Sequence, residues 1–202
     1  MDERLSVLGL AGSPCRQGNS EILLDRFLSA AETAGARVGK VWVPRLDIAS
    51  CVSCGGCSGS GECVVKDDFQ GINQRLIESD VIAVASPLFF WNVPAQLKAL
   101  IDRGQCQWSR KFLLKTPLPP TPAGHSRRRG VFFCVGADRR RYFEGAMWTV
   151  RSFLRVYEAA YWGELFLNQI EERGAITEHP TALAQAADLG RRSVVEDWEP
   201  RF

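Results

Sequence analysis

The first apolar run of the chain, Leu5-Ser6-Val7-Leu8-Gly9-Leu10-Ala11, ends in the turn sequence Gly12-Ser13-Pro14. A short apolar run that stops at glycine and proline is typical of a buried β-strand followed by a turn. Apolar residues then recur at helical spacing between residues 20 and 34. A strand, a turn and a helix in this order predict the first unit of an α/β fold.

The same alternation continues along the chain. We expect further strands at residues 38–43, 81–85, 131–135 and 161–167, and helices at residues 69–79, 94–103, 143–157 and 181–195. Residues 81–85 are apolar throughout, as in a strand that is buried on both faces. Strands joined by helices make right-handed crossovers. Five of them predict an α/β fold with a flavodoxin-like, doubly wound, five-stranded parallel sheet and helices on both faces.

Length and composition favour one domain that spans residues 1–202, because a chain with 46% hydrophobic residues and this length can bury one core. The net charge of +2 gives no case for nucleic acid as a partner. Residues 1–4 show no signal-peptide pattern and no apolar stretch approaches twenty residues, so we expect a cytoplasmic protein without membrane association. The seven cysteines lie mostly in one loop, as cytosolic ligands do.

One long segment, residues 105–129, lacks a clear helical or strand pattern. It carries four prolines and a glycine within eight positions, namely Pro117, Pro119, Pro120, Pro122 and Gly124. We expect this segment to be a surface excursion that serves as a lid or a partner contact. Beyond the last predicted helix, we expect Trp198 and Phe202 to dock on the body of the domain.

The loop at residues 12–20 lies between the first strand and the first helix. The N–H groups at a helix start favour an anion, so we expect a phosphate there. Ser13, Asn19 and Ser20 can donate further hydrogen bonds, and Arg16 can pair with the charge. The loop lacks the lysine of a nucleoside-triphosphate loop and the three-glycine spacing of a dinucleotide site, which disfavours ATP and Rossmann-bound NAD. A well-capped turn without a ligand is the alternative.

A second loop, residues 86–94, follows the third predicted strand. It contains the consecutive aromatic residues Phe89, Phe90 and Trp91, which need an apolar partner. A flavin ring would fit, and a dimer interface would bury the same side chains.

A third loop, residues 51–63, reads Cys51-Val-Ser-Cys54-Gly-Gly-Cys57-Ser-Gly-Ser-Gly-Glu-Cys63. Two-residue gaps let successive thiolates converge on one centre, and glycine lets the backbone wrap it. The run C-x2-C-x2-C with a nearby fourth cysteine favours a [4Fe-4S] cluster. Tetrahedral zinc and unliganded thiols remain the alternatives.

These three loops together resemble the NADPH-dependent FMN reductase superfamily, and within it the iron-sulfur flavoproteins. The resemblance rests on the motifs of residues 12–20, 51–69 and 86–103, and it covers about the first half of the chain. It implies one FMN per subunit, a [4Fe-4S] cluster on the four cysteines, and a dimer or a dimer of dimers. One departure is Cys15, which stands where the family usually has arginine.

The resemblance also assigns residues to the cofactor, with no side chain in a catalytic role. The FMN phosphate is expected at Ser13, Arg16, Gly18, Asn19 and Ser20. The flavin ring is expected to be lined by Pro87, Leu88, Phe89, Phe90, Trp91 and Asn92, and its edge to be completed near Gly136.

A few other residues carry weaker signals. We expect Arg127–Arg129 to be a solvated charge run, as such runs usually are. The run 139–141 follows the fourth strand, where a nicotinamide phosphate or an acidic carrier protein could dock, with a solvated run as the alternative. His125 and His179 are expected at the surface, and residues 67 and 68 are expected to cap a helix.

The function these features favour is an FMN-dependent redox protein that passes electrons between a [4Fe-4S] cluster and FMN. NAD(P)H is a candidate reductant, and ferredoxin or another electron carrier a candidate partner of the homodimer or homotetramer. Two alternatives stay open. One is an NAD(P)H-dependent FMN or quinone reductase without a cluster, and the other is a non-enzymatic flavin electron carrier.

Overall fold

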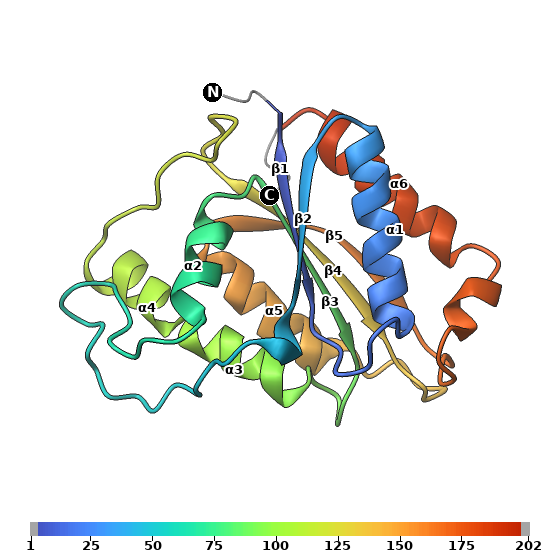
Figure 1. The fold of residues 1–202 in the computed structure, drawn as a ribbon, viewed down its shortest axis with the longest axis horizontal. Helices are drawn as coiled ribbons and strands as arrows, with labels where there is room; N and C mark the ends of the chain where they lie inside the picture. Colours follow the sequence, from blue (N-terminus) through green and yellow to red (C-terminus); the bar gives the residue numbers. More distant parts are fainter. Residues whose placement is uncertain (1–3, 199–202) are drawn as a thin grey trace.

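The computed structural model describes residues 4–198, in which five strands form one parallel sheet (Figure 1). The strands are β1 (Ser6–Ala11), β2 (Arg37–Trp42), β3 (Val81–Pro87), β4 (Arg128–Val135) and β5 (Ala159–Leu167). Their order in the sheet is β2-β1-β3-β4-β5, and every neighbouring pair is parallel. The strand order switches direction between β1 and β3, which confirms the doubly wound, flavodoxin-like sheet that the sequence predicts.

Helices cover both faces of this sheet (Figure 1). One layer holds α1 (Asn19–Thr33) and α6 (Ala182–Val195), and the other holds α2 (Phe69–Ile77), α3 (Ala95–Arg103), α4 (Gln105–Trp108) and α5 (Glu144–Val156). Each layer packs its own apolar core against the sheet. The central strand β3 is buried from Val81 to Ser86, because helices lie on both of its faces. No helix within residues 4–198 has both the length and the apolar character needed to cross a membrane.

The segment 105–129 is more regular than expected in its first nine residues. The helix α4 and a π-helical turn, η2 (Ser109–Leu113), continue almost directly from α3. Residues 105–113 contain neither proline nor glycine, and Cys106 and Ser109 are buried, so helical structure is retained. The prolines begin at Pro117, and the segment from there to β4 forms no helix.

The expectation that Arg127–Arg129 is solvated is wrong for two of its residues. Strand β4 begins at Arg128, three residues earlier than predicted, and the side chains of Arg128 and Arg129 are buried. The Arg128 guanidinium donates to the carbonyls of Ile77 (2.5 Å) and Pro119 (3.2 Å). Carbonyl acceptors replace the water that a buried guanidinium would lose, which is why burial is tolerated here.

The C-terminal expectation is confirmed for Trp198, while Phe202 lies outside the described residues. The indole Nε1 of Trp198 donates to the Arg127 carbonyl at 2.7 Å, and its ring stacks on His125 with centroids 4.1 Å apart. His125 is therefore half-buried instead of fully at the surface. The ring of His179 accepts the amide N–H of Ala182 at 3.1 Å and so helps to cap α6.

Candidate functional site

A cavity of about 280 Å³ opens at the carboxyl edge of the sheet, where the loops after β1, β3, β4 and β5 meet. Its lining residues are Ser13, Cys15, Gly18, Asn19, Ser20, Pro87, Leu88, Phe89, Val135, Ala137, Ile170, Glu171 and Arg173. Seven of these are residues that the sequence assigned to the flavin, and they come from two loops about seventy residues apart. The parallel topology brings them together, because the carboxyl ends of all strands lie at one edge.

The polar end of the cavity is the start of α1. Gly18 is the N-cap of this helix, and no side chain caps the first turn. Ser13 and Ser20 are buried beside it, and the Ser13 hydroxyl accepts the amide N–H of Cys15 at 3.1 Å. An uncapped helix start with unsatisfied N–H groups suits a phosphate. The opposite wall is apolar and suits a flat ring, so the residues present fit FMN.

Two residues expected to bind the phosphate have other partners. The Arg16 guanidinium lies over the Trp42 ring, 4.6 Å from its centroid, and its Nε is 3.9 Å from the Glu21 carboxylate. It does not line the cavity. The Asn19 side chain donates to the Glu172 carbonyl at 2.8 Å and accepts from the amide N–H of Ile176 at 3.2 Å. Asn19 thereby ties the start of α1 to the loop after β5.

The buried carboxylate of Glu21 explains the position of Arg16 by electrostatic attraction. Burial by itself would raise the pKa of Glu21, but the hydrogen bond from Lys40 (2.9 Å) and the amide N–H of Gln17 (2.6 Å) lower it below its usual range. A charged Glu21 attracts Arg16 as well as Lys40. Arg16 therefore balances an internal charge instead of facing the cavity.

The aromatic loop forms a tight hairpin. Phe89 and Asn92 exchange two backbone hydrogen bonds, of 2.8 and 2.9 Å, and Phe90 and Trp91 between them both have left-handed backbone angles, with φ of 46° and 61°. Of the three aromatic side chains in this loop, only that of Phe89 lines the cavity. The side chains of Phe90 and Trp91 are 103% and 61% exposed, and Asn92 uses its Oδ1 to accept from Val93 at 2.8 Å.

The hairpin is held against the start of α5. The Trp91 ring lies 5.0 Å from that of Tyr142, and a Cβ atom at Gly145 would meet the Trp91 carbonyl oxygen at 2.5 Å. Glycine at position 145 thus permits the close approach of the two backbones. The strained aromatic pair is fixed in place beside the cavity, without a partner among residues 4–198 that covers Phe90.

Gly136 lies next to the cavity but does not line it. Its amide N–H donates to the Leu167 carbonyl at 2.9 Å, while its neighbours Val135 and Ala137 line the cavity. After β4, the cavity is therefore lined by Val135 and Ala137, the two neighbours of the predicted Gly136.

The cysteine-rich loop, residues 51–63, is closed at its base by a buried ion pair. Arg103 of α3 donates from Nη1 to the Asp67 carboxylate at 2.6 Å, to the Ala49 carbonyl just before the loop at 2.9 Å, and from Nη2 to the Val65 carbonyl just after it at 3.0 Å. Asp67 also accepts the amide N–H groups of Phe69 (2.9 Å) and Ala49 (3.0 Å). Asp67 thus accepts the first amide N–H of α2, as predicted for a capping acid, and the ion pair adds a role that the sequence did not indicate. The capping expected of Asp68 is wrong, because its carboxylate accepts the amide N–H of Asp47 at 2.8 Å and makes no cap bond to α2.

The thiols of this loop are not gathered into one set. Cys51 and Cys54 are exposed, whereas Cys57 and Cys63 are half-buried and pack against the apolar core below α3. Within residues 4–198, no group of three or more cysteine, histidine or acidic side chains is arranged to hold a metal ion. The donor set, four thiols within thirteen residues of one loop, suits a cluster chemically.

One polar group on the helical segment after α3 contacts a half-buried thiol of the cysteine-rich loop. The Cys57 sulfur lies 3.4 Å from the Ser109 hydroxyl oxygen. Burial raises the pKa of the neighbouring Cys106 thiol to about 12, which keeps that thiol neutral.

The sequence did not indicate the contribution of the loop after β5. Ile170, Glu171 and Arg173 line the cavity, and Arg173 donates to the Gln17 side chain at 3.3 Å. The rule that ligands bind at the carboxyl ends of the strands applies to β5 as well as to the first four strands, so topology was the signal for these residues.

The fold and cavity define a flavodoxin-like flavoprotein. The NADPH-dependent FMN reductase family matches residues 5–158, and the chain belongs to this family of flavin-dependent oxidoreductases. Its relatives include proteins named iron-sulfur flavoproteins. One from Methanocaldococcus jannaschii is 30% identical over 196 residues, which are 96% of this chain and 89% of that protein.

Two further iron-sulfur flavoproteins match different lengths of the chain. The protein from Methanosarcina thermophila is 27% identical over 95% of this chain and 91% of its own length. A protein from Archaeoglobus fulgidus is 39% identical over 99 residues, which are 49% of this chain and 45% of that relative. The latter match spans less than half of the relative.

Solved structures share the fold at low sequence identity. An NAD(P)H:quinone oxidoreductase from Methanothermobacter marburgensis superposes with a TM-score of 0.66 at 18% identity, over 94% of this chain and 96% of that one. An FMN-dependent NADH-azoreductase from Bacillus anthracis, solved with FMN, gives 0.62 at 11% identity, over 94% and 99%. These likenesses confirm the flavodoxin-like architecture.

Proposed function

We propose that this protein is an FMN-dependent oxidoreductase that passes electrons between FMN and a [4Fe-4S] cluster held by Cys51, Cys54, Cys57 and Cys63. The observation that carries the flavin part is the cavity at the carboxyl edge, with an uncapped helix start at one end and apolar walls. FMN exchanges two electrons and a cluster one, which couples two-electron to one-electron carriers. The names of the relatives and the C-x2-C-x2-C spacing support the cluster.

The residues of the chain have defined tasks in this proposal. The amides of Gly18 to Ser20 hold the phosphate, and Ser13 and Ser20 provide further donors beside it. Pro87, Leu88 and Phe89 exclude water from one side of the ring. The reaction needs no side chain as a nucleophile or as an acid. The protein's part is to bind the cofactors, orient them and shield them from water.

The proposal includes a homodimer or homotetramer. Its support is the exposed, strained pair Phe90 and Trp91 beside the cavity, since large exposed aromatic side chains commonly mark interfaces. Ferredoxin or another one-electron carrier is the proposed protein partner, and NAD(P)H the proposed two-electron reductant.

The deciding measurement is the content of iron, acid-labile sulfide, zinc and FMN per chain in anaerobically purified protein, with visible spectra before and after dithionite. About four iron and four sulfide atoms with one FMN are expected. FMN with zinc, or without any metal, would contradict the cluster and leave the flavin assignment intact.

A cluster-free NAD(P)H-dependent FMN or quinone reductase is the second candidate, and the match of the NADPH-dependent FMN reductase family to residues 5–158 supports it. Steady-state oxidation of NAD(P)H distinguishes both enzymes from a carrier that reduces no small substrate. A rate no faster than that with free FMN would exclude direct reduction by NAD(P)H.

A further inference from the structure

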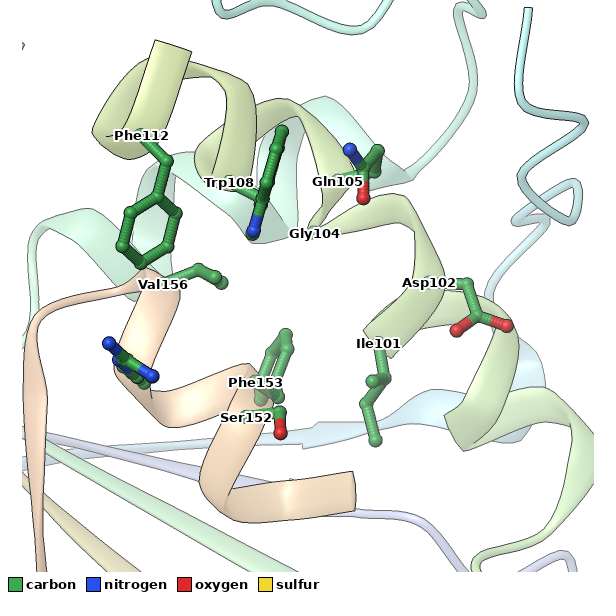
Figure 2. A pocket seen from close by; sticks show the side chains of 10 residues that line it. Ile101, Asp102, Gly104, Gln105, Trp108, Phe112, Ser152, Phe153 and Val156 are labelled. Atoms are coloured by element: carbon green, nitrogen blue, oxygen red, sulfur yellow. The ribbon is translucent and has the colours of Figure 1, made fainter. Parts of the chain in front are cut away.

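The edge of the sheet opposite the flavin cavity carries two adjoining hollows. The apolar groove, about 500 Å³, lies between the segment of α3, α4 and η2 and the helix α5, and Figure 2 shows the rings of Trp108 and Phe112 across it from Val156 and Phe153. The cationic pocket, about 470 Å³, lies where β4 and β5 begin. Arg155 lines both, so the two hollows meet at this side chain.

The cationic pocket is lined by more basic than acidic side chains. Lys111, Arg127 and Arg155 line it, and within residues 4–198 none of the three forms an ion pair. The single acid in its lining, Glu158, accepts the amide N–H of Leu118 at 3.2 Å. An anion would balance these charges.

The apolar groove offers flat surfaces next to that charge. Trp108 and Phe112 are more than one-third exposed, although both rings are large and apolar. The ring of Phe112 lies under two cations, 5.7 Å from Lys111 Nζ and 5.4 Å from the Arg155 guanidinium carbon. The only acid of the groove, Asp102, is paired with Lys98 at 2.8 Å. Exposed aromatic faces offer a surface on which a flat ring can stack, and the adjacent cations favour a ring that carries a negative group.

We propose that the two hollows form one binding site for a small anion that carries a flat aromatic ring. The ring lies among Trp108, Phe112 and Phe153, and the negative group is bound by Lys111 and Arg155. Face-to-face packing of a second copy on this surface is disfavoured, because it would bring the same cations together. The site is separate from the flavin cavity, which lies at the other ends of the strands.

The electrostatics of Lys111 agree with this assignment. Burial lowers the pKa of Lys111, and Arg155 and Arg127 lower it further against the opposing effect of Glu158. A bound anion would act in the opposite direction and raise the pKa of this lysine.

The test uses isothermal titration calorimetry on the full chain with FMN bound and free flavin removed. The probes are 2-naphthoate, the neutral 2-naphthalenemethanol, inorganic phosphate and adenosine monophosphate. We expect one saturable naphthoate site per chain, with the neutral ring and the ringless anion each at least about ten-fold weaker. Tighter binding of adenosine monophosphate than of naphthoate would assign the anion to a nucleotide phosphate, and the reverse order to a carboxylate.

Variants locate the site. Arg155→Gln and Lys111→Gln should each weaken naphthoate binding about ten-fold. The matched control is Arg151→Gln, one turn earlier on α5, because Arg151 lies over Trp148 (5.1 Å) and Tyr161 (5.0 Å) and does not line either hollow. Since Lys111 also donates to the Arg155 carbonyl at 2.8 Å and supports the end of α5, Arg155→Gln is the decisive variant.

Three outcomes would overturn the proposal. The first is no saturable naphthoate binding up to the solubility limit. The second is equal binding by Arg155→Gln and Arg151→Gln. The third is affinity that falls as protein concentration rises, which would mean that a second copy covers the groove.

Discussion

Arg103 and Asp67 form an ion pair with Nη1 and Oδ2 2.6 Å apart, and both side chains are buried below the cysteine-rich loop. Because Arg103 also binds the carbonyls of Ala49 and Val65, the pair joins the two ends of the loop to α3. The thiols in between are carried by a short segment whose base is fixed. Loop geometry and overall stability therefore depend on the same two residues.

The first prediction concerns this pair. Asp67→Asn leaves the Arg103 charge buried and uncompensated, so we expect the free energy of unfolding to fall by about 3 kcal/mol or more. Urea unfolding followed by tryptophan fluorescence measures the change. The control is Lys98→Ala on the same helix, which breaks an exposed pair with Asp102 and should cost less than about 1 kcal/mol. Equal losses in the two variants would contradict the role given to the buried pair.

The second prediction is the pH dependence of that stabilisation. Burial by itself raises the pKa of Asp67, but the hydrogen bond from Arg103 outweighs it, and the pKa is lowered in the folded chain. The pair's contribution is therefore complete above the unfolded pKa, near pH 4, and is lost as the pH falls through the folded pKa. The stability difference between the natural chain and Asp67→Asn should be constant from about pH 5 to 7 and shrink below about pH 4. A difference that grows on acidification would show the wrong sign.

The third prediction separates the structural from the ligating role of the cysteines. Cys51→Ser and Cys54→Ser should change the free energy of unfolding by less than about 0.5 kcal/mol, because both side chains are exposed. Cys57→Ser and Cys63→Ser should cost about 1 kcal/mol, since both pack against the core. If the proposed cluster forms, each of the four variants loses iron and sulfide but retains FMN.

Cys15→Ser is the control for the iron and sulfide content alone, because Cys15 is exposed and lies outside the cysteine-rich loop but lines the flavin cavity. Iron and sulfide analysis together with flavin absorbance reads out all five variants. Unchanged iron in Cys51→Ser or Cys54→Ser would remove that residue from the ligand set. Loss of FMN along with iron would mean that the loop is needed for the flavin cavity itself.

The fourth prediction tests the strained hairpin. Phe90 is fully exposed with a left-handed backbone, so Phe90→Asn should stabilise the FMN-free chain by about 1 kcal/mol, since asparagine tolerates that conformation. Trp91→Asn should not stabilise the FMN-free chain, because the substitution removes the ring that packs on Tyr142. Thermal unfolding of the two variants gives the comparison, and a destabilised Phe90→Asn would contradict strain at this position.

The regular part of the fold could be predicted from the sequence, because apolar periodicity and turn residues record where each strand and helix lies. All five strands and their helices occur within a few residues of the expected positions. Arg128 was misplaced for a physical reason. A charge run indicates solvent, and only the folded chain shows that the carbonyls of Ile77 and Pro119 solvate this guanidinium.

The candidate site was predictable where a loop has its own motif and not where the site depends on the tertiary structure. Ser13, Gly18 and Ser20 lie at the cavity because glycine and serine at a helix start specify that loop locally. The positions of Arg16 and Arg173 could not be predicted in this way, because they depend on partners that are distant in the sequence. Buried Glu21 and the Trp42 ring attract Arg16, while the loop after β5 brings Arg173 to the cavity.

The last prediction follows because Arg173 lines the cavity where the sequence predicted Arg16. Arg173→Gln should raise the dissociation constant of FMN about ten-fold, because Arg173 lines the cavity and donates to Gln17 of the loop where the phosphate is expected, so its charge would balance the phosphate. Arg16→Gln should change it less than about two-fold, since Arg16 is held by Trp42 and Glu21. Riboflavin lacks the phosphate and should bind both variants equally, so titration of flavin fluorescence with the two ligands separates phosphate binding from ring binding. A larger loss of FMN affinity in Arg16→Gln would mean that this side chain leaves Trp42 when the flavin binds.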